Sequence, residues 1–228
     1  MEILHIIPAR GGSKGIKNKN LKLLKNKPIV AHAIDTSLKS KYITRVVVST
    51  DKKEIGQVAL DHGAEVVWRP AVISGDKATT ESALLYTIDY YKKTENYLPD
   101  YICLTQATTP LTLPEDIDQT IQLVIEQKAS TGIGCGPFES SIWVQENKPF
   151  VKNITNNFFF PGDTIDRHKT KNEYLEGGAI WVFETKGFLR VKFKFWDKIV
   201  MHVMDANRVY DIDEPVDYSI IESIINQR

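Results

Sequence analysis

Two kinds of segment alternate through the first two thirds of this 228-residue chain. Short runs of β-branched and aliphatic residues favour strands, and the segments between them repeat their apolar residues every three or four positions, as helices do. We expect strands at Ile3–Ile7, Arg45–Ser49, Glu65–Trp68, Tyr101–Leu104 and Thr131–Cys135, and helices over 29–38, 55–63, 83–91 and 114–125. This alternation predicts an α/β fold, in which a mostly parallel sheet carries helices on both faces.

Three polar segments follow predicted strands and are therefore candidates for a binding site. They are Arg10–Gly15, Ser49–Asp51 and Gln106–Pro110. Ligands of such sheets bind beyond the carboxyl ends of the strands. We expect the three segments to converge there.

The charge balance and the cysteines limit the class of protein. The 29 basic and 29 acidic residues give no net charge, which argues against general binding to nucleic acid or to an anionic membrane. Cys103 and Cys135 lie in separate apolar runs, so we expect two buried thiols. No basic leader or run of about 20 apolar residues is present. We expect a single cytoplasmic domain over residues 1–228.

The glycine-rich loop after the first predicted strand has the composition of an anion site. Its residues are Arg10, Gly11, Gly12, Ser13, Lys14 and Gly15, with Lys19 and Asn20 shortly after. Glycines let backbone N–H groups approach an anion closely, and the basic side chains add positive charge. The loop therefore suits a triphosphate. The spacing matches neither a Walker A loop nor a dinucleotide fingerprint, so a dehydrogenase is disfavoured, whereas a solvated turn stays open on composition alone.

A pair of aspartates near the end of the chain could hold a metal ion. Asp211 and Asp213 alternate, so on an extended strand both carboxylates face the same side. Two carboxylates and the oxygens of a phosphate suit Mg²⁺. A turn or helix cap before Glu214 is the structural alternative. A helix is expected over Glu214–Ile224, with Val216, Ile220, Ile221 and Ile224 turned inward.

The alternation stops between Pro137 and Glu176. This stretch contains Phe158–Phe160 and the charged run Asp166–Lys169, and strand character returns at Gly178–Phe183. A structureless loop of this length is uncommon within a compact domain. We expect an arm or hairpin lobe that packs on another subunit.

Together these segments resemble the acylneuraminate cytidylyltransferase family, the CMP-sialic acid synthetases. The likeness runs in order through Arg10–Ile16, Val48–Asp51, Arg69–Ala71, Gly75–Thr80, Leu104–Leu111, Gly178–Ile180 and Asp211–Asp213. Because the motifs occur in register over nearly the whole chain, the resemblance is specific.

The resemblance implies a Rossmann-like nucleotidyltransferase fold. It implies transfer of CMP from CTP to the anomeric hydroxyl of a 2-keto-3-deoxy acid sugar, with release of pyrophosphate. Catalysis would rest on Arg10, Lys14, Asp211 and Asp213, with Mg²⁺ on the two aspartates. The implied nucleotide-binding residues are Arg10, Gly11, Gly12, Ser13, Lys14, Lys19, Asn20, Arg69, Thr80 and Gln106, and the implied sugar-binding residues are Gln106 and Arg167.

The departures from the family pattern all lie on the sugar side. Leu175 and Gly177 stand where sialic-acid members have an arginine and an asparagine, and Thr112 replaces another arginine. The acceptor is therefore open among sialic acid, legionaminate, pseudaminate and Kdo, and GTP remains an alternative nucleotide. A non-catalytic nucleotide-binding protein is the alternative from another class.

The resemblance also implies a homodimer. In the family the arm, here 137–176, crosses to the neighbouring active site, so Arg167 would act in trans on the acid sugar. A guanidinium suits this task because it binds a carboxylate through two parallel N–H groups.

Overall fold

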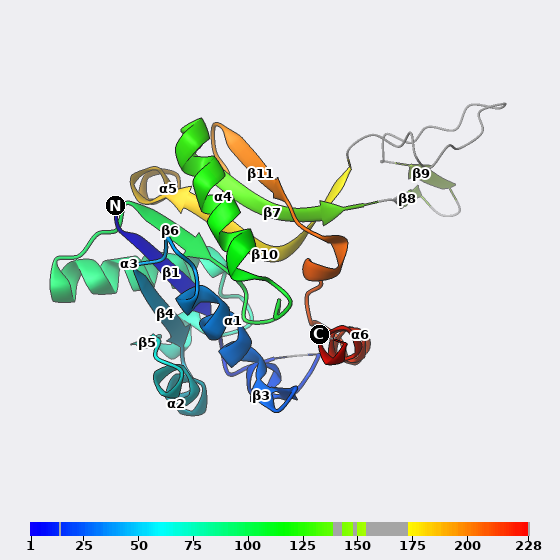
Figure 1. Ribbon diagram of the computed structural model, residues 1–228, viewed down its shortest axis with the longest axis horizontal. Coiled ribbons are helices and arrows are strands. Elements are labelled where there is room, and N and C mark those ends of the chain that lie inside the picture. The colour runs from blue at the N-terminus through cyan, green and yellow to red at the C-terminus, as the bar shows by residue number, and fades with distance from the viewer. Residues whose placement is uncertain (14, 139–142, 148–149, 154–172, 228) are drawn as a thin grey trace.

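A seven-stranded sheet forms the centre of the computed structural model (Figure 1), in the order β11-β7-β10-β6-β1-β4-β5. The structure describes residues 1–13, 15–138, 143–147, 150–153 and 173–227. Lys14, Arg167 and Phe158–Phe160, to which the sequence analysis assigned roles, lie outside the described residues.

The strands on the β1 side of the sheet run parallel, as predicted. They are β1 (Ile3–Pro8), β4 (Arg45–Thr50), β5 (Glu65–Trp68) and β6 (Tyr101–Leu104). Beyond β6 lie β10 (Tyr174–Glu184), β7 (Thr131–Pro137) and β11 (Ile199–Val203). β10 is antiparallel to both neighbours, whereas β11 is parallel to β7. The sheet is thus mostly parallel.

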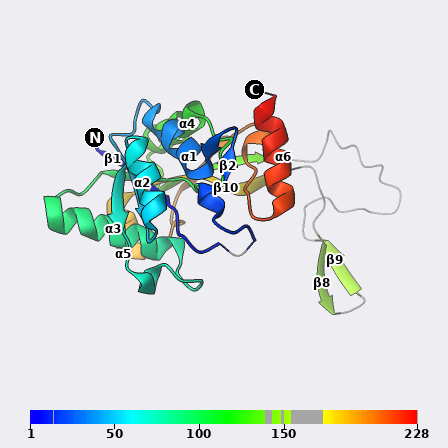
Figure 2. The same ribbon diagram turned by 90° about the horizontal axis from the view of Figure 1, so that it is seen from below.

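Helices cover both faces of the sheet (Figure 2). One face carries α1 (Ile29–Leu38), α2 (Lys53–Asp61) and α4 (Pro114–Gln127), and the other carries α3 (Thr80–Glu95) and α5 (Thr185–Val191). Each face has its own buried apolar clusters. A further cluster joins α6 (Pro215–Asn226) to Leu24, Leu111 and Ile212, so the last helix is held against the early part of the chain.

The smaller elements lie in the connections. They are the 3-10 helices η1 (Lys19–Leu21), η2 (Ala71–Ile73) and η4 (Ala206–Arg208), the pair β2 (Leu23–Leu24) and β3 (Lys27–Pro28), and the antiparallel pair β8 (Trp143–Asn147) and β9 (Phe150–Asn153). The last pair belongs to the predicted arm, whose role in dimerisation remains a prediction.

Two predictions about the end of the chain are wrong. The residues Asp211–Asp213 form no strand but an irregular segment before α6. On α6, Val216 and Ile220 are exposed rather than inward, whereas Ile221 is buried and Ile224 partly buried, as predicted. Tyr218 and Ile225 are buried as well. The helix packs on Leu24, Ile29 and Leu111, which cover one face of it.

His5 lies at the centre of the core, in β1. Its side chain is fully buried, with Nε2 2.9 Å from Thr105 Oγ1, and Nδ1 has no hydrogen-bond partner among the described residues. Burial lowers the pKa of His5 to about 3. The ring is therefore neutral in the folded protein at physiological pH.

We predict that His5 makes folding sensitive to mild acid. The unfolded chain takes up a proton at His5 near pH 6.5 and the folded protein does so only near pH 3, so stability is lost as the pH falls through this window, at up to about 1.4 kcal/mol per pH unit. Urea unfolding at about pH 7 and about pH 5 should show a smaller loss for His5→Gln than for the unaltered protein. Equal losses would contradict the assignment.

Candidate active site

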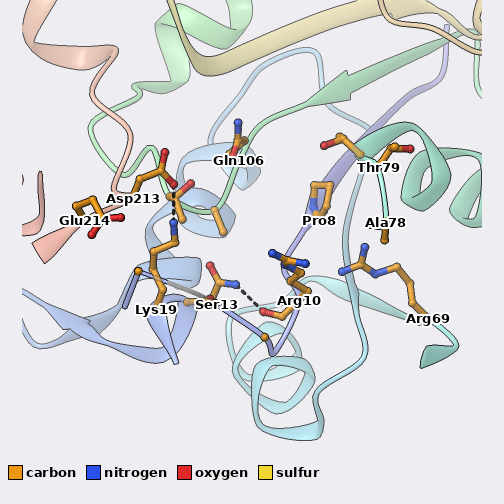
Figure 3. A pocket seen from close by; sticks show the side chains of 16 residues that line it. Pro8, Arg10, Ser13, Lys19, Arg69, Ala78, Thr79, Gln106, Asp213 and Glu214 are labelled. Atoms are coloured by element: carbon orange, nitrogen blue, oxygen red, sulfur yellow. Dashed lines mark hydrogen bonds and ion pairs between the residues drawn. The ribbon is translucent and has the colours of Figure 1, made fainter. Parts of the chain in front are cut away.

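A cavity of about 530 Å³ opens at the carboxyl ends of the central strands (Figure 3). The three polar segments predicted to converge contribute to it or to its support. Its lining residues are Pro8, Arg10, Gly12, Ser13, Gly15, Lys19, Asn20, Arg69, Ala78, Thr79, Thr80, Gln106, Ala107, Thr108, Asp213 and Glu214. Nine of the predicted site residues are in this set.

The glycine-rich loop is held in place by side chains on both sides. Gly11 N–H donates to Asp51 Oδ1 at 2.8 Å, at the end of β4. Asn20 Nδ2 donates to the carbonyl of Arg10 at 3.0 Å. Asn20 is buried, so its role here is to fix the loop. The loop is therefore preorganised rather than a solvated turn.

Arg10 and Arg69 bring two guanidinium groups to one part of the cavity (Figure 3). Arg10 Nη1 donates to the carbonyl of Gly75 at 2.9 Å and lies 3.3 Å from Asp76 Oδ1. Arg69 is 8% exposed, and its Nε and Nη2 have no partner among the described residues. Burial, together with the charge of Arg10, lowers the pKa of Arg69, while Asp51 opposes that shift. Buried donors of this kind call for an oxygen acceptor in a ligand.

Residues 209–214 carry Asp213 and Glu214 to the opposite wall of the cavity. Ile212 is buried, and its N–H donates to the carbonyl of Thr108 at 3.0 Å. Lys19 Nζ donates to the carbonyl of Ile212 and lies 3.0 Å from Asp213 Oδ1 (Figure 3). Lys19 therefore links the segment that follows the glycine-rich loop to the segment that carries Asp213.

The two aspartates differ in their surroundings. The side chain of Asp213 is 73% exposed and lines the cavity. Asp211 does not line the cavity, and its Oδ1 is buried without a partner among the described residues. Burial raises the pKa of Asp211, and the charge of Asp213 adds to this, while Thr108 and Lys19 oppose it.

Asp211 and Asp213 are the candidate ligands for a divalent metal ion. The buried, unpartnered oxygen of Asp211 fits a bound cation, because a metal would satisfy it. Within the described part of the chain, no group of three or more His, Cys, Asp or Glu residues gathers for a metal. The pair fits an ion whose other ligands come from a substrate and water.

Gln106 closes the cavity beside the strand β10. Gly178 has a φ of +78°, which favours glycine, and the end of the Gln106 side chain lies against it. Thr80 lines the cavity at the start of α3, where Thr79 caps the helix by accepting from Ser82 N–H at 3.2 Å. The carbonyl of Gln106 accepts from Thr109 N–H at 3.4 Å.

The structure adds residues to which the sequence analysis gave no role. Thr79, Thr108 and Glu214 line the cavity. Thr79 and Thr108 lie inside motifs that the sequence singled out, Gly75–Thr80 and Leu104–Leu111, and Glu214 directly follows Asp211–Asp213, so reading every polar position of these segments would have found them. Of the predicted nucleotide-binding residues, Gly11 contributes through its N–H bond to Asp51 rather than by lining the cavity.

Comparison with known proteins decides the family. A family model for cytidylyltransferases matches residues 4–186. The chain belongs to the cytidylyltransferase family. Membership makes it a nucleotidyltransferase, as the order of the motifs had indicated.

Relatives in this cytidylyltransferase family match almost the full chain. A pseudaminic acid cytidylyltransferase from Campylobacter jejuni (strain 81-176) is 30% identical, over 93% of this chain and 91% of the relative. A CMP-N,N'-diacetyllegionaminic acid synthase from C. jejuni (strain NCTC 11168) is 31% identical, over 99% and 95%. The solved structure of CMP-2-keto-3-deoxy-manno-octonic acid synthetase, complexed with CTP, shares the fold with a TM-score of 0.73 at 16% identity, over 100% and 99% of the two chains. This confirms the predicted nucleotidyltransferase fold.

None of the described helices combines the length and the apolar character that crossing a bilayer requires.

We predict that the contact between the glycine-rich loop and the aspartate segment tolerates no added methyl group. A Cβ on Gly15 would lie 2.2 Å from the carbonyl oxygen of Asp213, whereas a Cβ on Gly12 would meet nothing within 4 Å. Gly15→Ala should lower the free energy of unfolding by about 1–3 kcal/mol. Gly12→Ala, as the matched control, should leave it nearly unchanged. Thermal unfolding without nucleotide measures both, and equal melting temperatures for the two variants would contradict the packing.

Proposed function

We propose that this protein transfers CMP from CTP to the anomeric hydroxyl of a 2-keto-3-deoxy acid sugar. The observation that carries the proposal is the contact of Lys19 with Asp213, because both residues line the same cavity as the glycine-rich loop. A nucleotide on the loop would have its phosphates facing the carboxylates. The anomeric oxygen would bond to the α-phosphorus as the bond to the bridging oxygen breaks, the hydroxyl proton would pass to water, and pyrophosphate would leave.

The loop would bind the triphosphate. Arg10, Ser13 and the backbone N–H groups of the glycines offer positive charge and donors at the cavity wall. Negative charge gathers on the pyrophosphate as it leaves, and fixed donors lower the energy of that state most when they need no rearrangement. The anchoring of Gly11 and Asn20 supports such preorganisation. Lys14 adjoins Ser13 in the sequence and is proposed for the same role.

The base would lie against Arg69 and Thr80. Cytosine presents a carbonyl oxygen and a ring nitrogen that accept hydrogen bonds, and the two unpartnered donors of Arg69 are complementary to such an edge. The hydroxyl of Thr80 both donates and accepts. This donor set is compatible with CTP, and because guanine also offers a carbonyl oxygen and a ring nitrogen, GTP is tested beside it.

Asp211 and Asp213 would hold Mg²⁺, the ion that two carboxylates and phosphate oxygens suit. When bound, such an ion offsets the charge of the phosphates and makes a hydroxyl more acidic. Lys19 would keep Asp213 oriented and balance part of the negative charge at this wall. Gln106, which faces the same cavity, would lie between the nucleotide and the sugar.

The acceptor class is a nonulosonic acid. The relatives named for pseudaminate and for legionaminate match this chain at 30% and 31% identity, so both sugars belong in the test. The departures from the sialic-acid pattern at Thr112, Leu175 and Gly177 support an acceptor other than N-acetylneuraminate.

The proposal predicts pyrophosphate release from CTP in the presence of Mg²⁺ and one member of a sugar panel. The panel comprises pseudaminate, legionaminate, N-acetylneuraminate and Kdo, with GTP replacing CTP in parallel reactions. Turnover with one acid sugar and CTP is expected. No release with any sugar and either nucleotide would overturn the proposal, and CTP binding without turnover would instead indicate a non-catalytic protein.

Loss of either proposed metal ligand should abolish turnover while the fold is kept. Asp213→Asn and Asp211→Asn are expected to lower kcat at least about 100-fold, because each removes a negatively charged ligand of the proposed metal ion. Asp89→Asn, on an exposed part of α3 where Asp89 pairs with Lys93, is the matched control and should keep full turnover. Turnover by both site variants at the rate of the control would remove the metal assignment.

A homodimer that exchanges the arm over 137–176 is part of the same proposal, with Arg167 reaching the acid sugar of the neighbouring subunit. Exposed Tyr174 and Leu175, at the base of this arm, support an apolar contact there. Light scattering at micromolar concentration should give about twice the chain mass, and a monomer would contradict the exchange.

A further inference from the structure

A buried carboxylate outside the cavity is linked to the aspartate segment. Asp116, in the first turn of α4, is 2% exposed. Its Oδ2 accepts from Leu113 N–H at 3.0 Å and from Arg208 Nε at 2.9 Å. Its Oδ1 accepts from Arg208 Nη2 at 3.0 Å and lies 3.3 Å from His202 Nε2. Both oxygens are thus fully engaged.

The partners of Asp116 lie on the path that leads to the aspartates. His202 belongs to β11, and Arg208 is the last residue of η4, three positions before Asp211. The 3-10 helix is itself capped, since Asp205 accepts from Asn207 N–H at 2.9 Å. The planar fork of Arg208 therefore fixes the start of the aspartate segment in both position and orientation.

Val209, which follows Arg208, is packed closely against two glycines, Gly136 and Gly177. A Cβ on Gly177 would lie 1.8 Å from the carbonyl oxygen of Val209, and one on Gly136 would lie 2.7 Å from a methyl group of Val209. From there the segment reaches Ile212, which is bonded to Thr108 and Lys19. Asp211 thus lies between two attachment points, Arg208 and Ile212, and Asp213 directly follows the second.

Stability alone does not account for a buried ion pair at this place. Removing two charges from water costs about as much as their attraction returns, so such pairs add little net stability. What they supply is a fixed geometry. Burial by itself would raise the pKa of Asp116, but bonds from His202, Arg208 and Leu113 N–H hold it below its usual range. The carboxylate of Asp116 thus stays charged and remains paired with the guanidinium of Arg208.

We propose that Asp116 is a positioning residue for nucleotidyl transfer, which acts through Arg208 to hold Asp211 and Asp213 at a set distance from the glycine-rich loop. It touches neither the cavity nor, in the proposed function, any substrate. The catalytic part of this inference rests on the proposed function. The structural part, that Asp116 and Arg208 order residues 209–213, does not.

The experiment compares Arg208→Ala with Arg45→Ala. Arg45 also pairs with two carboxylates, Glu65 and Glu95, at the start of β4, at the opposite end of the sheet from the cavity. Because Glu65 and Glu95 are 42% and 44% exposed and Asp116 is buried, the free energy of unfolding of both variants is measured, and their hydrogen exchange is compared at equal global stability. Arg208→Lys and Asp116→Asn provide milder changes if the alanine variant unfolds.

Two measurements need no turnover. Hydrogen exchange should show that the Ile212 amide, bonded to Thr108, exchanges at least about tenfold faster in Arg208→Ala and normally in Arg45→Ala. Titration of the protein–CTP complex with Mn²⁺, followed by electron paramagnetic resonance, should give a Kd raised at least about fivefold in Arg208→Ala, while metal-free CTP binding changes less than about twofold.

The kinetic measurement separates positioning from binding. Arg208→Ala should lower kcat at least about tenfold with little change in the KM for CTP, because a shift of about 1 Å at reacting groups is costly. Arg208→Lys should recover part of kcat, since it keeps the charge but not the two-pronged bond. Unaltered Ile212 exchange and Mn²⁺ affinity in Arg208→Ala, or equal changes in Arg45→Ala, would overturn the inference. Absence of turnover in the unaltered protein would overturn the proposed function instead.

Discussion

The cavity depends on the contact between the ammonium group of Lys19 and the segment that carries Asp213. This ammonium group contacts the carbonyl of Ile212 and Asp213 Oδ1, and so joins residues 194 positions apart. Together with the bond from Ile212 N–H to the carbonyl of Thr108, it holds the aspartate segment across the cavity from the cationic loop. Gly15 adds to this contact, because its missing side chain leaves room for the carbonyl of Asp213. Charge and close packing therefore act at the same place to form one site.

Much of the fold could be predicted from the sequence because many of its helices and strands are indicated by the residues within them. The strand Glu65–Trp68 and the helix ending before Gly63 were predicted within a residue or two, since a β-branched run and a left-handed glycine are local signals. The antiparallel direction of β10, the helix α5 and the edge strand β11 were not predicted. They are set by packing against β6, β7 and the α3 face, which no local pattern contains.

The candidate site also has a part that local motifs predict and a part that depends on distant contacts. Arg10, Ser13, Lys19 and Gln106 were found from ordered motifs, and the structure brings them to one cavity. The strand expected at Asp211–Asp213 was wrong because its conformation follows from distant partners, namely Thr108, Lys19 and, through Arg208, Asp116. Likewise Val216 and Ile220 fit a helical period, but the neighbours of α6 cover only its other face.

The central claim is that one nucleotide touches both walls of the cavity. A crystal grown with CTP and Mn²⁺, with anomalous diffraction used to locate the metal, tests it most directly. The account predicts a metal peak within coordination distance of Asp211, Asp213 and a phosphate oxygen, with the triphosphate on the glycine-rich loop. A triphosphate bound to that loop with the metal away from both aspartates would contradict it.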